Sequence, residues 1–152
     1  VETEYYNVKV AYMDGRDLGY VYINGNDVPA RGEIVNEYKL LCGGRLTKNQ
    51  NVITNIRLID KMSICTSSWA VLYTNSSIED AKNACTYVKT RFFRLLVDLT
   101  CHGNMTNISP YRFSLVPMQD FSKPWTDEDL YKKYNLTQEE IEYIESMIKP
   151  ME

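Results

Sequence analysis

The residues best suited to chemistry gather in one irregular stretch, Gly43 to Arg57 (GGRLTKNQNVITNIR), which combines glycines, bases and amide side chains. Side chains of Arg, Lys, Asn and Gln contact phosphates and base edges in nucleic-acid complexes, and paired glycines let a backbone approach a phosphate closely. The side chains of this kind belong to Arg45, Lys48, Asn49, Gln50 and Arg57. An ordinary polar loop explains the same composition, so other features of the chain must decide between the two interpretations.

The sequence lacks the common catalytic motifs. His102 is the only histidine, and the chain has no GxSxG, GxxxxGK(S/T) or GxGxxG pattern, which argues against triad catalysis and nucleotide binding. One nuclease-like spacing exists, because Asp60 is followed by Asp80 and Lys82, which together could hold Mg²⁺. However, Asp80 falls in the first turn of a predicted helix, where the helix dipole favours acids. We therefore expect no catalytic residue and no metal site.

A long amphipathic helix is the element predicted to position the cations. Apolar residues recur at three- and four-residue steps from Ser76 to Thr100, the spacing of one helical face. Either of two hydroxyl and acid pairs can cap its start: Ser76 with Glu79, or Ser77 with Asp80. We predict one continuous helix of about residues 77–100 that presents four cations: Lys82, Lys89, Arg91 and Arg94.

The other segments predict strands and then two further helices. Runs of β-forming residues predict these strands: Tyr5–Met13, Leu18–Ile23, Tyr38–Cys42, Lys61–Cys65 and Ser68–Thr74. Two capping boxes, Thr126 with Asp129 and Thr137 with Glu140, start the C-terminal helices. We expect an α+β fold with a small mixed or antiparallel sheet packed on the long helix. Its main domain is predicted at residues 1–125, and residues 126–152 form a helical pair on the same domain.

Charge is distributed unevenly along the chain. The net charge is −3, yet residues 39–123 hold eleven bases and five acids, and residues 126–152 hold three bases and eight acids. A local basic surface, rather than the net charge, decides whether a polyanion binds. The basic middle of the chain therefore keeps a nucleic-acid partner possible, while the acidic end should face away from it.

Cysteine usage and hydropathy bear on the cellular compartment. The four isolated cysteines, with no CxxC pair, favour buried reduced thiols over a zinc site: Cys42, Cys65, Cys85 and Cys101. A secreted module with two disulfides is the alternative, and four glycosylation sequons would fit it, at Asn75, Asn104, Asn107 and Asn135. No apolar run approaches the roughly 18–20 residues that cross a bilayer, so we expect a cytoplasmic protein without membrane contact. The start at Val1 suggests an excised fragment or a mature product.

Two segments resemble the C-terminal end of bacterial type II restriction-modification adenine methyltransferases. The resemblance is closest in KTRFFRLL (Lys89–Leu96) and in DFSKPWTDEDLYKKYNLTQEEIEYIE (Asp120–Glu145), and extends more weakly back to about Val35. In that family an N-terminal domain binds S-adenosylmethionine and methylates adenine N6 at an Asn- or Asp-Pro-Pro-aromatic motif. A C-terminal region recognises the DNA target, and some relatives also carry an endonuclease activity.

The resemblance implies a DNA target-recognition region separated from its catalytic partner. The chain has neither the tetrapeptide nor a cofactor-binding glycine motif, so we expect no cofactor in this fragment and S-adenosylmethionine in a catalytic domain of the same parent chain. The expected partners are double-stranded DNA and that catalytic domain. The expected phosphate contacts are Lys89, Arg91, Arg94 and Arg112, and the candidates for base edges are Arg45, Lys48, Asn49, Gln50, Asn104 and Asn107.

A protein-interaction module is the rival hypothesis. In that case the amphipathic faces dock a partner subunit and DNA is never touched. Salt distinguishes the two, since phosphate binding weakens steeply as salt rises, whereas an apolar docking face is far less sensitive.

Overall fold

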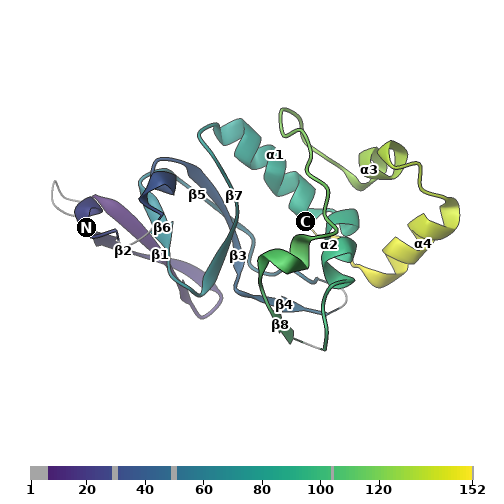
Figure 1. The fold of residues 1–152 in the computed structure, drawn as a ribbon, viewed down its shortest axis with the longest axis horizontal. Helices are drawn as coiled ribbons and strands as arrows, with labels where there is room; N and C mark the ends of the chain where they lie inside the picture. Colours follow the sequence, from purple (N-terminus) through teal and green to yellow (C-terminus); the bar gives the residue numbers. More distant parts are fainter. Residues whose placement is uncertain (1–6, 29–30, 49–50, 104, 152) are drawn as a thin grey trace. The chain divides into compact units, whose positions relative to one another are not determined.

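The structure is a computed structural model that describes residues 7–28, 31–48, 51–103 and 105–151. In the described residues, the strands come before the α-helices, apart from one short strand that lies between two of the helices, and this segregation confirms the α+β fold class (Figure 1). The chain divides into two compact units, one formed by residues 1–44 and 55–81 and the other by residues 45–54 and 82–152. Each unit has its own buried residues. Among the described residues, none of the helices combines the length and the apolar character that crossing a bilayer requires.

The first unit opens with a β-hairpin. β1 (Val8–Asp14) pairs antiparallel with β2 (Asp17–Ile23), and β6 (Ser63–Cys65) adds to β1 in parallel. The predicted strand pair is thus confirmed. Its connection is a two-residue turn, because Asp14 pairs with Asp17, and Gly15 in this turn takes a φ of +63° that favours glycine.

A second antiparallel sheet completes this unit. β3 (Tyr38–Gly43) lies between β5 (Arg57–Ile59) and β7 (Trp69–Asn75). β3 is central and nearly all of its residues are buried, as expected for a strand covered on both faces. A cluster of buried apolar side chains joins this sheet to the hairpin: Ala11, Leu41, Ile59 and Trp69.

The predicted single helix of residues 77–100 is wrong, because the structure has two helices there. α1 (Ile78–Lys89) ends before Thr90, whose extended backbone (ψ 150°) interrupts the helix, and α2 (Arg91–Asp98) follows. The Thr90 hydroxyl accepts a 3.1 Å hydrogen bond from the Phe93 N–H and so caps α2. A threonine can end one helix and start the next in this way. The break was not predicted because the apolar spacing continues across it.

The two C-terminal helices begin where their capping boxes predict. α3 (Asp127–Lys133) follows the Thr126 cap, and α4 (Gln138–Met147) follows the Thr137 cap. Both helices contact α2 within the second unit. Residues 82–125 therefore belong to the same compact unit as residues 126–152.

Two short strands lie within segments that read as loops in the sequence. β4 (Arg45–Thr47) pairs antiparallel with β8 (Met105–Asn107) to form a separate two-stranded ribbon in the second unit (Figure 1). Three short 3-10 helices complete the elements: η1 (Gly25–Asp27), η2 (Gly32–Ile34) and η3 (Pro110–Phe113).

Candidate nucleic-acid interface

The β4–β8 ribbon brings two predicted base-contacting residues together. Arg45 is the direct cross-strand partner of Asn107, and both side chains are exposed. The next pair, Leu46 and Thr106, is buried, since successive side chains of a strand point to opposite faces. The ribbon therefore anchors one face in the second unit and presents Arg45 and Asn107 from the other.

The segment that follows β4 turns back on the strand and anchors its end in the core. The Thr47 N–H donates a 2.9 Å hydrogen bond to the Val52 carbonyl, and the side chains of Val52 and Ile53 are fully buried. Val52 has a φ of +59°, which is unfavourable for a β-branched residue and persists only where the surroundings hold it. Lys48 directly follows this anchored strand and is exposed.

Arg112 lies close to the same ribbon. Its guanidinium donates a hydrogen bond to the Thr100 carbonyl and lies 5.5 Å from the centre of the Tyr111 ring, while the Thr100 hydroxyl donates to the Arg112 carbonyl at 2.9 Å. Burial raises the pKa of the Cys101 thiol, and the positive charges of Arg112 and Lys48 act in the opposite direction. Both cations therefore lie within electrostatic range of the residue that leads into β8.

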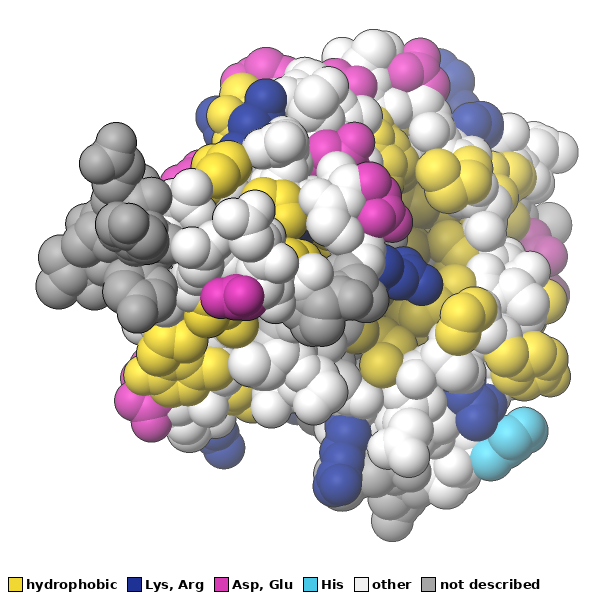
Figure 2. Space-filling model, turned by 60° about the vertical axis from the view of Figure 1, so that its left-hand side comes forward, with side chains coloured by type: hydrophobic (Ala, Val, Ile, Leu, Met, Phe, Trp, Pro, Cys, Tyr) yellow, Lys and Arg dark blue, Asp and Glu magenta, His cyan; other side chains and the backbone are white. Residues whose placement is uncertain are grey.

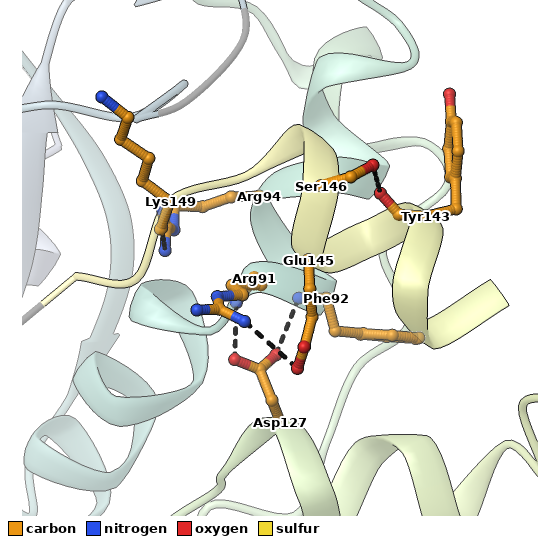
Figure 3. A network of polar contacts seen from close by, with 8 residues as sticks. All are labelled: Arg91, Phe92, Arg94, Asp127, Tyr143, Glu145, Ser146 and Lys149. Atoms are coloured by element: carbon orange, nitrogen blue, oxygen red, sulfur yellow. Dashed lines mark hydrogen bonds and ion pairs between the residues drawn. The ribbon is translucent and has the colours of Figure 1, made fainter. Parts of the chain in front are cut away.

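Two other predicted phosphate ligands are engaged inside the second unit (Figure 3). Arg94 is 0% exposed, and its guanidinium donates to the carbonyls of Lys89 (3.1 Å), Thr90 (3.2 Å) and Lys149 (2.6 Å). Its burial contradicts a phosphate contact. Arg91 forms a 3.1 Å ion pair with Glu145. The arginines of α2 thus hold helices together, a role that periodicity alone could not distinguish from a cationic face.

The remaining candidates fall into two groups. Lys89 is the last residue of α1 and is half-buried. Asn49, Gln50 and Asn104 lie outside the described residues. Lys and Arg side chains are scattered over the face that Figure 2 draws. The candidate cationic group is therefore defined by its place at the β4–β8 ribbon. That group consists of Arg45, Lys48 and Arg112.

Sequence reasoning missed two exposed neighbours of this group. Tyr111, whose ring Arg112 covers, is 63% exposed, and His102 is exposed at the entry to β8. An aromatic residue next to an arginine in a polar segment was the available signal, because bases stack on aromatic rings. Arg57, in contrast, belongs to the first unit and donates to the carbonyl of Ile56 at 3.0 Å.

The structure also bears on the alternative chemistries. All four cysteines carry free thiols, which speaks against the pair of disulfides expected of a secreted module. The Ser77 hydroxyl accepts a 3.3 Å hydrogen bond from the Asp80 N–H at the start of α1 and donates to the Asp80 carboxylate, so Asp80 belongs to a helix cap. Among the described residues, no group of His, Cys, Asp and Glu side chains is arranged to hold a metal ion.

Comparisons of the chain with protein-family models, with curated proteins and with solved structures each gave no match, so the geometry of the β4–β8 ribbon is the basis for a functional assignment.

Proposed function

We propose that the chain is a DNA target-recognition region and that the β4–β8 ribbon contacts the major groove. The observation that carries this proposal is the exposed cross-strand pair of Arg45 and Asn107 on a ribbon whose opposite face is buried. The resemblance of the α2 and C-terminal segments to adenine methyltransferases supports it. The parent would be a cytoplasmic site-specific N6-adenine methyltransferase, or a combined restriction-modification enzyme, whose catalytic domain supplies S-adenosylmethionine.

The two side chains suit base recognition. A two-stranded β-ribbon fits the major groove of B-DNA, where Arg pairs with guanine O6 and N7 and Asn pairs with adenine N6 and N7. Directly opposed residues have Cβ atoms about 5 Å apart. Consecutive base pairs are about 3.4 Å apart. Arg45 and Asn107 can therefore read neighbouring base pairs, one of which is an adenine pair.

Phosphate contacts come from the cations beside the ribbon. Lys48 is exposed at the end of β4, and Arg112 is held near β8 by its bond to Thr100. Two phosphate contacts give a salt dependence of log K against log salt of about −2, because each contributes about −0.9. The isolated chain should therefore bind DNA weakly and leave tight binding and methylation to the complete parent enzyme.

Selection from random duplex DNA tests this proposal. The chain is mixed with a random duplex pool at about 50 mM and about 200 mM salt, where phosphate contacts differ in strength, and the retained DNA is sequenced. We expect salt-sensitive retention and enrichment of a short motif that contains adenine. The same selection is repeated with Arg45→Ala, with Asn107→Ala and with the matched control Arg16→Ala, which alters an exposed arginine of the first unit.

The variants separate base readout from general attraction. Loss of one bidentate base contact costs about 1–3 kcal/mol and relaxes the preference at one position. Arg45→Ala and Asn107→Ala should each relax a different position of the motif, while Arg16→Ala leaves it unchanged. Retention that is equal for all variants would overturn the ribbon as the interface. Absence of retention at low salt would favour the rival, a protein-interaction module.

A further inference from the structure

An apolar groove runs between α2 and α4, within the second unit. Its volume is about 540 Å³, and buried side chains of Phe92, Leu95 and Ile144 form its floor. Leu99 and Tyr143 line its rim and are 53% and 52% exposed. Large apolar side chains at this exposure, gathered around one depression, are typical of binding surfaces rather than of scattered surface residues.

One side of this groove is acidic. Glu139 and Glu140, in the first turn of α4, line it together with the apolar residues. Glu140 accepts a 2.8 Å hydrogen bond from the Thr137 N–H, which fixes its carboxylate at the rim, and Glu139 is exposed. The groove therefore pairs an apolar floor with a negative edge, which a phosphate backbone would avoid.

We propose that the α2–α4 groove binds a short amphipathic helix of a partner protein, with apolar anchors along one face and Lys or Arg beside them. Recognition of this kind uses anchors at positions i, i+3 or i+4, and i+7. From Phe92 in α2 to Leu99, the residue directly after α2, the groove spans seven residue steps, a length of about 10 Å at 1.5 Å per residue, which matches two turns of a bound helix.

Charge decides which occupant fits. The acidic rim attracts cations, and complementary charge favours the correct partner and suppresses like-charged ones. A second copy that docked through its C-terminal helices would bring their acids, including Glu128 and Glu142, against this rim. A basic helix of a partner protein is therefore the occupant, and Tyr143 is its expected hot spot.

A helical peptide library provides the test. Peptides of about 14 residues, or four turns, carry Leu or Ile at i, i+3, i+4 and i+7 and random residues elsewhere. They are selected on the intact chain and counter-selected on the Leu99→Asp variant. We expect the retained peptides to be enriched in Lys and Arg beside the apolar stripe. The affinity of the most enriched peptide is then measured by fluorescence anisotropy.

The affinity measurements include matched variants. Tyr143→Ala and Leu99→Asp should each weaken binding at least tenfold, and Glu139→Lys should weaken it and reduce its salt dependence. Leu115→Asp is the control, because Leu115 is 51% exposed in the same unit but does not line the groove. Thermal unfolding verifies that each variant remains folded.

Three outcomes would overturn the proposal. They are a lack of Leu99-dependent binders, an enrichment of acidic instead of basic residues, and equal loss of affinity in Leu115→Asp and Leu99→Asp. The result is independent of the proposed function, since DNA retention by Leu99→Asp should equal that of the unaltered chain. Failure of peptide binding with intact DNA retention would reject the groove alone.

Discussion

The Asp127 carboxylate, in the first residue of α3, accepts a 3.0 Å hydrogen bond from the backbone N–H of Arg91, in the first residue of α2. Its other oxygen accepts from the Phe92 N–H at 2.9 Å. The first N–H groups of a helix have no partner within the helix, and an acid at this end also favours the helix dipole. One residue of α3 therefore caps the first turn of α2 (Figure 3).

Removal of this cap should destabilise the second unit. Asp127→Ala leaves two N–H groups without an acceptor, and loss of such a cap costs about 1–2 kcal/mol. Urea unfolding followed by circular dichroism measures the change. Glu128→Ala serves as the control, because Glu128 is exposed on the same helix. Equal midpoints for the two variants would contradict the capping role.

Arg94 should contribute to stability and not to DNA affinity. Arg94→Lys keeps the charge but cannot reproduce the guanidinium bonds to Lys89, Thr90 and Lys149, so we expect a loss of about 2 kcal/mol. Arg91→Lys, which alters an ion pair at the surface, should cost less than about 1 kcal/mol. The free energies of unfolding and the DNA affinities of both variants distinguish a role in stability from a role in DNA binding. Weaker DNA binding by Arg94→Lys at unchanged stability would restore it as a phosphate contact.

Lys48 and Arg45 should differ in how they affect DNA binding. Lys48→Ala removes a phosphate contact and should reduce the salt slope by about 1 while leaving sequence preference unchanged. Arg45→Ala should instead relax that preference. Anisotropy titrations at several salt concentrations, on the selected motif and on a scrambled duplex, measure both quantities. An unchanged salt slope in Lys48→Ala would remove Lys48 from the interface.

The sequence predicts those helix boundaries of the second unit that local capping interactions determine. The capping boxes at Thr126 and Thr137 fix both C-terminal helix starts, because the hydroxyl and the acid lie three residues apart. At Thr90 the local cap was hidden by continuous apolar periodicity, and the second cap of α2, the Asp127 carboxylate, lies 36 residues after Arg91. Its stabilisation is a tertiary interaction, which overrides local propensity.

The candidate interface shows the same division. Residue types alone drew attention to Arg45 and Asn107, but their pairing joins two strands of three residues each from distant parts of the chain. Strands this short carry almost no alternation to detect. Arg94 was misread for the opposite reason, because a buried arginine that satisfies carbonyl groups and an exposed one occupy the same helical pattern.

Deprotonation of the buried Lys39 should increase the free energy of unfolding of the first unit as pH rises above neutrality. Its side chain is fully buried in β3, where its ammonium donates to the carbonyls of Glu37 (2.5 Å) and Val35 (3.3 Å). Burial lowers the pKa of Lys39 from 10.5 to about 8. Between these values the unfolded chain holds more protons than the folded chain, so stability increases with pH. Below pH 8 the cost of burying the charge is fully present.

Urea midpoints at pH 7.5, 8.5 and 9.5, which span the folded pKa of about 8, measure this effect. The unaltered chain should gain stability across the series, and Lys39→Met should lose that gain because it removes the titrating group. Lys61→Met is the control, since Lys61 is exposed. The same pH dependence in Lys39→Met and in the unaltered chain would assign the effect to another residue.

The thiols offer a separate check on the fold and on the compartment. Cys42 is fully buried in the central strand β3, and burial raises the pKa of its thiol to about 12. The thiolate is the reactive form, so at pH 8 Cys42 should react with a thiol reagent far more slowly than the half-buried Cys65 and Cys85. Denaturation without reductant should expose all four thiols, because each cysteine is free. A count of zero reactive thiols in the denatured protein would establish two disulfides and favour the secreted module. Rapid modification of Cys42 in the native protein would contradict the central position of β3.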